Sequence, residues 1–126
     1  MRLFLLASAG GALGAGARYL VGVLAVSWLG AGFPWGTLFV NVVGSFLMGI
    51  VVEGVALRCG GSTELRTFLS TGILGGFTTF SAFSLEVVAL AERKLPGLAL
   101  AYVIASVVLA VAALVAGMAL VRSLCP

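Results

Sequence analysis

The segment GGFTTFSAFSLE at 75–86 contains residue types that can bind ions of either charge. Glycine inside a helix costs roughly 1 kcal/mol against alanine, and a helix broken inside a membrane survives only where its freed backbone groups find partners or line a cavity. A break at Gly75–Thr79 would present carbonyl oxygens to a small hard cation, and Gly75 is expected to adopt backbone angles that a Cβ resists. Phe80 and Phe83 follow on one helical face. This spacing is typical of ordinary packing, but the positive edges of the rings can also contact an anion.

Two other apolar segments carry polar side chains at helical spacing. Thr37, Asn41 and Ser45 follow one another at i, i+4, and Tyr102 and Ser106 repeat the pattern. Hydrogen bonds between helices commonly explain Ser and Thr at such positions, and we accept that interpretation for Thr37 and Ser45. Asn41 has two donors and two acceptor sites to satisfy, and we expect it to present N–H donors to an anion.

Three charged residues lie within or near the apolar segments. Arg18 stands well inside the first segment, and Glu53 and Glu86 stand toward helix ends. A charge at the bilayer centre costs at least about 2.5–3.5 kcal/mol, so such groups face water or a partner. Pairing of Arg18 with Glu86 and a direct role in ion passage are equally open. An arginine near a pore mouth would also concentrate anions.

The composition indicates that these residues are carried by membrane-spanning helices. The 126 residues are 62% hydrophobic and 9% charged, with a mean hydropathy of +1.27, whereas soluble domains carry about 25% charged residues. A spanning helix needs roughly 20 apolar residues, and the charge-free stretches are 3–17, 19–52, 67–85 and 95–121. The pattern predicts a single four-helix transmembrane domain over 1–126, with helices at about 3–26, 35–57, 66–91 and 97–121.

Several function classes are excluded by what the chain contains. Its Lys and Arg residues are scattered, so no basic patch for nucleic acid is expected. Cys59 and Cys125 occur without any histidine, and this makes neither a zinc site nor a Cys–His nucleophile pair. We expect two incidental thiols and no enzyme.

The charges at the helix ends give little orientation bias. Four spans place both termini on one side, and four cations share it against two on the other: Arg2, Arg58, Arg66 and Arg122 against Arg93 and Lys94. A bias this weak allows insertion in both orientations. Gly10 with Gly14, and Gly72 with Gly76, have the GxxxG spacing that lets helix backbones approach closely. Four helices leave little room for a hydrated path, so we expect an oligomer.

The chain resembles the Fluc/CrcB family of fluoride channels, small bacterial membrane proteins. The resemblance covers essentially the whole chain and is strongest in GGALGAGARY at 10–19, PWGTLFVNVVGSFLMG at 34–49 and GGFTTFSAFSLE at 75–86. It implies an all-α fold with the third of four helices broken at mid-membrane. It also implies an antiparallel homodimer in the bacterial inner membrane that exports fluoride passively through two pores.

The resemblance also implies roles for single residues. Asn41 would donate to fluoride, Phe80 and Phe83 would line the pore, and a central structural sodium ion would bind backbone carbonyls of both subunits. The carbonyls are those of Gly75 and Thr78, and the remaining candidates along the fluoride pathway are Tyr102, Ser106, Thr37, Arg18 and Glu86. Family members often continue the track of Tyr102 and Ser106 with another hydroxyl, from which Ala110 departs.

Two alternatives come from other classes. A small proton-coupled multidrug transporter also has four spans, but it needs a carboxylate in its first helix, where this chain has Arg18 and no acid. An assembly subunit without a transport role would show no flux of any ion.

Overall fold

The computed structural model is helical and describes residues 1–58 and 60–126, without the side chains of 56–58. Cys59 and the side chain of Arg58 therefore lie outside the described residues. Among the described residues, four helices are long and apolar enough to cross a membrane: Arg2–Leu29, Trp35–Val55, Thr63–Glu92 and Pro96–Leu124. The prediction of an all-α protein with four spans is thus confirmed.

The first and fourth spans are continuous helices, α1 (Arg2–Leu29) and α6 (Pro96–Leu124). The second consists of α2 (Trp35–Ile50) and a wider-turned segment, η1 (Val51–Arg58). The third consists of α3 (Thr63–Arg66), the wider-turned η2 (Thr67–Leu74), α4 (Gly75–Phe77) and α5 (Ser81–Glu92). This span begins before the expected residue 66, because Ser62 caps it: the amide of Leu65 donates to Ser62 Oγ at 3.0 Å.

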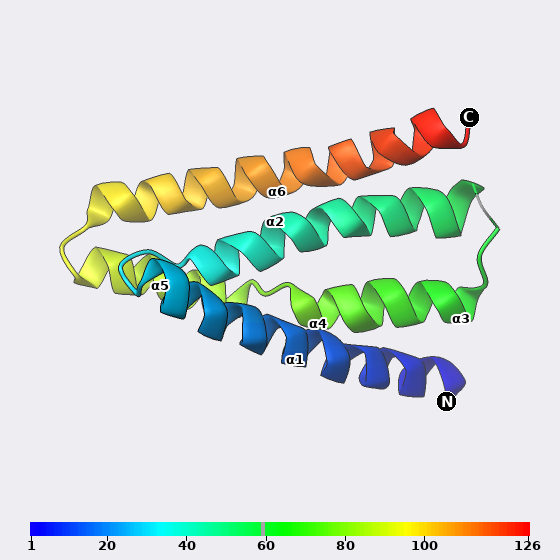
Figure 1. Ribbon diagram of the computed structural model, residues 1–126, viewed down its shortest axis with the longest axis horizontal. Helices are drawn as coiled ribbons and strands as arrows, with labels where there is room; N and C mark the ends of the chain where they lie inside the picture. The colour runs from blue at the N-terminus through cyan, green and yellow to red at the C-terminus, as the bar shows by residue number, and fades with distance from the viewer. Residues whose placement is uncertain (59) are drawn as a thin grey trace.

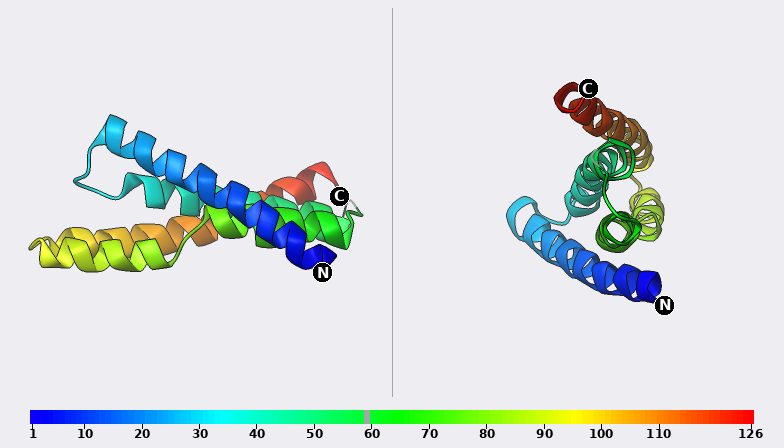
Figure 2. Two further views of the ribbon diagram at one scale, coloured as in Figure 1. Left: turned by 90° about the horizontal axis from the view of Figure 1, so that it is seen from below. Right: turned by 90° about the vertical axis from the view of Figure 1, so that its right-hand side faces the viewer.

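The spans form a bundle whose two ends are easily distinguished (Figure 1). α2 lies along α6, α5 packs on the first half of α6, and α1 crosses the third span at η2 and α4. Both termini lie at the same end of the bundle (Figures 1 and 2), as an even number of spans requires. The third span is therefore held between α1 and α2.

Glycines set the close approach of α1 to the third span. A Cβ on Gly10 would lie 2.7 Å from the carbonyl oxygen of Phe68, and one on Gly14 would collide with the backbone of Ile73. A Cβ on Gly76 would likewise collide with the α1 backbone. The prediction that the GxxxG pairs serve helix packing is confirmed.

The buried interior joins α5 and α6. Tyr102, Leu90, Phe83 and Ala99 form its centre. Near the end that holds the termini, the carboxylate of Glu53 is 2% exposed and accepts from Arg122 Nε at 2.8 Å. The Arg122 side chain is itself exposed, and this ion pair ties the second span to the last.

Candidate functional site

The helical pattern of the third span is interrupted between α4 and α5. α4 ends at Phe77, Thr78 is extended with φ −85° and ψ 161°, and α5 begins at Ser81. Gly75 has φ −63° and ψ −37°, an ordinary right-handed helical conformation. The expectation that Gly75 needs angles closed to other residues is therefore wrong. The change of direction is made at Thr78.

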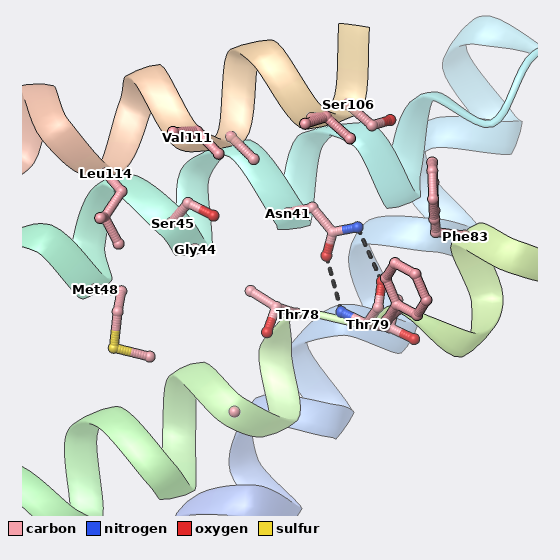
Figure 3. Close-up of a pocket in the computed structure, with 14 residues that line it drawn as sticks. Asn41, Gly44, Ser45, Met48, Thr78, Thr79, Phe83, Ser106, Val111 and Leu114 are labelled. Atoms are coloured by element: carbon pink, nitrogen blue, oxygen red, sulfur yellow. Dashed lines mark hydrogen bonds between the residues drawn. The ribbon is translucent and has the colours of Figure 1, made fainter. Parts of the chain in front are cut away.

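The side chain of Asn41, on α2, pairs with the backbone of Thr79. Asn41 Nδ2 donates to the carbonyl oxygen of Thr79 at 2.9 Å, and the amide of Thr79 donates to Asn41 Oδ1 at 2.8 Å (Figure 3). These bonds satisfy two backbone groups at the interruption. An amide side chain has two N–H donors, so one Nδ2 hydrogen of Asn41 remains for another acceptor.

A second side-chain bond begins α5. The amide of Ala82 donates to Thr79 Oγ1 at 3.2 Å. In a continuous helix, the amide of Thr79 would donate a hydrogen bond to the carbonyl of Gly75, and the amide of Ala82 would donate one to the carbonyl of Thr78. Both donors are engaged elsewhere, and within residues 1–58 and 60–126 no hydrogen bond reaches either of these carbonyl oxygens.

Arg18, on α1, reaches the end of α4. Its Nε donates to the carbonyl oxygen of Gly76 at 3.0 Å. A cationic side chain is favourable at a helix C-terminus, where carbonyls lack partners and the dipole is negative. The sequence left open a pairing of Arg18 with Glu86, and the structure does not form it.

Glu86, on α5, instead gathers two hydroxyl groups. Thr37 Oγ1 donates to one carboxylate oxygen at 2.9 Å, and the Tyr102 hydroxyl donates to the other at 3.1 Å. The cluster joins α2, α5 and α6. The prediction that Thr37 makes a hydrogen bond between helices is confirmed.

The two candidate phenylalanines differ in their surroundings. Their ring centroids are 5.5 Å apart, but Phe83 is 8% exposed and Phe80 is 77% exposed. Phe83 also packs against Tyr102, with ring centroids 5.1 Å apart. Phe83 thus belongs to the core, while Phe80 stands on the surface of the single chain.

A cavity of about 480 Å³ lies beside the interruption. Its walls include most of the predicted site: Asn41, Gly75, Thr78, Phe80, Phe83 and Ser106 (Figure 3). Ser106 Oγ is buried there and makes no hydrogen bond to any described residue. The cavity therefore holds donors and acceptors that the chain itself leaves unsatisfied.

Of the other candidates, Arg18, Thr37 and Glu86 lie around neighbouring cavities, whereas Tyr102 is fully buried in the core. Arg18 and Thr37 line a second cavity of about 490 Å³, and Thr79 lines both. Thr37 and Glu86 line a third, smaller cavity. Asn41 and Thr79 thus meet where the two large cavities adjoin.

Sequence reasoning missed Thr79 and Gly76. The backbone of Thr79 is hydrogen-bonded to the side chain of Asn41, and the carbonyl of Gly76 accepts from Arg18. The signal was present in part, because backbone groups freed at a break in an apolar environment require partners. The sequence does not show which faces of α1 and α2 pack against the third span. The same gap hid the ion pair of Glu53 with Arg122.

Comparisons with known proteins extend over nearly the whole chain. The family model for CrcB-like protein, Camphor Resistance (CrcB), matches residues 5–118. A protein of Agrobacterium fabrum is 56% identical over 119 residues, 94% of this chain and 95% of its own. One of Rhizobium meliloti is 53% identical over 124 residues, covering 98% and 99%. One of Phenylobacterium zucineum is 55% identical over 123 residues, covering 97% of each. All three are named fluoride-specific ion channel FluC.

Replacing Asn41 with leucine is expected to loosen the interruption. Both backbone groups of Thr79 lose their partners, each at a cost of about 1–3 kcal/mol. The melting temperature in detergent should fall, and amide hydrogen exchange over residues 78–80, followed by mass spectrometry, should accelerate. Thr37→Val is the control, because it removes a hydroxyl from the same helix without touching Thr79. Equal exchange in wild type and Asn41→Leu would contradict the structural role of the amide.

Proposed function

The chain belongs to the CrcB-like family, and on that premise we propose that it is a fluoride channel through which fluoride leaves the cell passively. The observation that carries the proposal is an identity of 53–56% with three proteins named as fluoride-specific channels, over nearly the full length of both partners. The chain is a multi-pass membrane protein, and the proposal places it in the inner membrane of a bacterium. Passive conduction needs no covalent step, so no enzymatic activity is assigned.

The proposed path for fluoride runs through the cavity of about 480 Å³. Its donors are the Asn41 amide hydrogen not used by Thr79 and the buried hydroxyl of Ser106. Phe80 and Phe83 add ring edges with positive potential. Fluoride is small and strongly hydrated, so its water must be replaced by close donors. A narrow path does this poorly for the larger chloride.

The second cavity is the proposed entrance to this path. The Arg18 guanidinium raises the local concentration of anions there, and its bond to Gly76 keeps the charge beside the interruption. The hydroxyls of Thr37 and Tyr102 are held by Glu86. We therefore assign Thr37 to the wall of the entrance, and Glu86 and Tyr102 to the cluster that holds Thr37 in position.

The proposed channel is an antiparallel homodimer. Phe80 is 77% exposed in one chain and Gly75 is also exposed, so the cavity needs a cover. Lipid would leave the unpaired carbonyls of Gly75 and Thr78 without any partner, whereas a second copy brings polar groups of its own. The weak charge bias of the loops lets the two copies enter the membrane in opposite orientations.

A structural sodium ion at the centre of that dimer is part of the proposal. Gly75 and Thr78 line the cavity beside the interruption, and their carbonyl oxygens have lost their helical donors to Asn41 and Thr79. Carbonyl oxygens are ligands for hard cations, so the donor set fits sodium. When bound, the ion supplies a positive charge that carbonyl dipoles of both chains share.

The transporter alternative has no observation in its favour. Proton coupling in that mechanism needs an acid in the first span, and the charged residues of α1 are Arg2 and Arg18. An assembly subunit without transport is excluded by the first of the following experiments if fluoride passes.

Purified protein in liposomes should pass fluoride and exclude chloride. Fluoride efflux is followed with an ion-selective electrode after a potassium ionophore is added to dissipate the membrane potential that opposes it. Chloride efflux is followed in parallel. Discrimination follows from short donor contacts in a narrow path. Equal rates for the two anions, or no fluoride efflux, would contradict the proposed function.

Phe80→Ile should reduce fluoride efflux by about fivefold, because an aromatic contact contributes on the order of 1 kcal/mol and about 1.4 kcal/mol is a factor of ten. Phe80 is exposed in the single chain, so folding of the chain itself should survive. Phe4→Ile, at another exposed phenylalanine on α1, is the control. Efflux at the wild-type rate in a dimeric Phe80→Ile variant would dismiss the ring-edge role.

Sodium should raise the melting temperature of the dimer and support its flux. An ion that binds only the folded dimer adds about 2.7 kcal/mol at 100 times its dissociation constant. The comparison is sodium against a large organic cation after prolonged sodium removal, with potassium expected to substitute poorly. Thr78→Ser keeps the carbonyl and should behave as wild type. If neither the melting temperature nor the fluoride flux changes after sodium removal, the proposed central site is refuted.

A further inference from the structure

Ser45 stands one helical turn after Asn41 and lines the same cavity. Figure 3 shows its side chain on α2, between Asn41 and Met48. The sequence led us to expect a hydrogen bond between helices for Ser45. Unlike Thr37, Ser45 makes none within the part of the chain that the structure describes, so that expectation is not met.

Other helical serines satisfy their hydroxyls locally. Ser8, Ser70 and Ser84 each donate to the carbonyl four residues earlier, at 2.8, 2.8 and 3.0 Å. Ser45 and Ser106 do not, and both line the cavity beside Asn41; Ser106 Oγ is fully buried, and Ser45 is half-buried. A hydroxyl without a partner in an apolar environment costs about 1–3 kcal/mol or more. A bound species in the cavity is the partner that these two hydroxyls lack.

The rest of the cavity wall favours an anion as that species. Val111, Leu114 and Met48 line the part of the cavity near Ser45 and are apolar, and low polarity strengthens a hydrogen bond to a charge. Serine offers an O–H donor, and bonds from a neutral donor to an anion are about twice as strong as neutral ones. Gly44, the residue before Ser45, packs against the side chain of Thr78, which fixes α2 against the interruption at this level.

Resting on the proposed fluoride channel, we propose that Ser45 is a further specificity-determining residue of the fluoride path. Its hydroxyl donates to the anion one helical turn beyond Asn41 and, with Ser106, makes a pair of hydroxyl donors from α2 and α6. The path therefore continues past Asn41 toward the end of the bundle where the chain begins and ends.

The first test is Ser45→Ala in liposomes. Loss of one hydrogen bond to a charged partner should lower fluoride efflux by about tenfold, with the melting temperature and dimer mass unchanged. Ser8→Ala is the matched control, since it removes a helical serine hydroxyl outside the cavity, and its efflux should equal that of wild type.

The second test does not depend on conduction. Ser45→Cys, made in a background of Cys59→Ala and Cys125→Ala, should react with a small water-soluble methanethiosulfonate reagent, seen as a mass shift of the intact protein. The same reagent should block efflux. Ser8→Cys should stay unmodified, because a thiol facing lipid forms little thiolate.

The outcomes separate this inference from the function on which it rests. Wild-type efflux in Ser45→Ala, a loss of efflux matched by a loss of stability, or an unreactive Ser45→Cys would each overturn the role of Ser45 while fluoride efflux by wild type still stood. Absence of fluoride efflux from the wild-type protein would overturn the proposed function itself.

Discussion

The backbone groups freed between α4 and α5 are the constraint on which the rest of this molecule depends. In an apolar environment each unsatisfied N–H or C=O costs several kcal/mol, so an extended residue at Thr78 is stable only if neighbouring side chains replace the helical bonds. The Asn41 side chain makes hydrogen bonds with both backbone groups of Thr79, and Arg18 donates to the carbonyl of Gly76. These bonds require α1 and α2 to lie close to the third span. The glycines at the α1 contact meet that requirement, because a Cβ would occupy the space of the opposite backbone.

Only some of the polar groups near the interruption have hydrogen-bond partners within the described residues, and the unpaired groups are informative. Gly75, Thr78, Ser45 and Ser106 line one cavity. The carbonyls of the two residues of the third span and the hydroxyls of the two serines have no hydrogen-bond partners in the described residues. Buried polar groups are almost always paired in native proteins, so the buried Ser106 hydroxyl, together with the unpaired groups around its cavity, marks where ions, water or a second chain complete the structure. Acceptors and donors lie on different elements, with carbonyls on the third span and hydroxyls on α2 and α6. This separation suits a cation beside the interruption and an anion path along the other helices.

The sequence was sufficient for the architecture because charge-free length alone sets the number of spans. It also singled out Asn41, since an amide with four hydrogen-bonding sites is costly to bury. It did not identify Thr79 as the partner, nor Gly76 as the acceptor for Arg18, because a helical repeat gives the face of each helix and not which faces meet. The helical spacing of Phe80 and Phe83 was informative about proximity but silent on burial, which depends on α6 and Tyr102. The backbone angles of Gly75 were misjudged because the bend was attributed to the glycine and is made at Thr78.

Asn41 combines two tasks that other residues perform separately. One Nδ2 hydrogen and Oδ1 hold Thr79 in place, and the remaining hydrogen is the donor that the proposed path uses. Any substitution there disturbs the scaffold and the path together, so a loss of conduction would not reveal which task had failed. Ser45 and Phe80 make no hydrogen bond to the interruption through their side chains, and changes there leave the bonds of Thr79 intact. The path is therefore best tested by substitutions at Ser45 and Phe80, which leave the hydrogen bonds of the interruption intact. The scaffold is best tested at Thr79, because hydrogen exchange of its amide reports directly on the bond to Asn41 that stabilises the interruption.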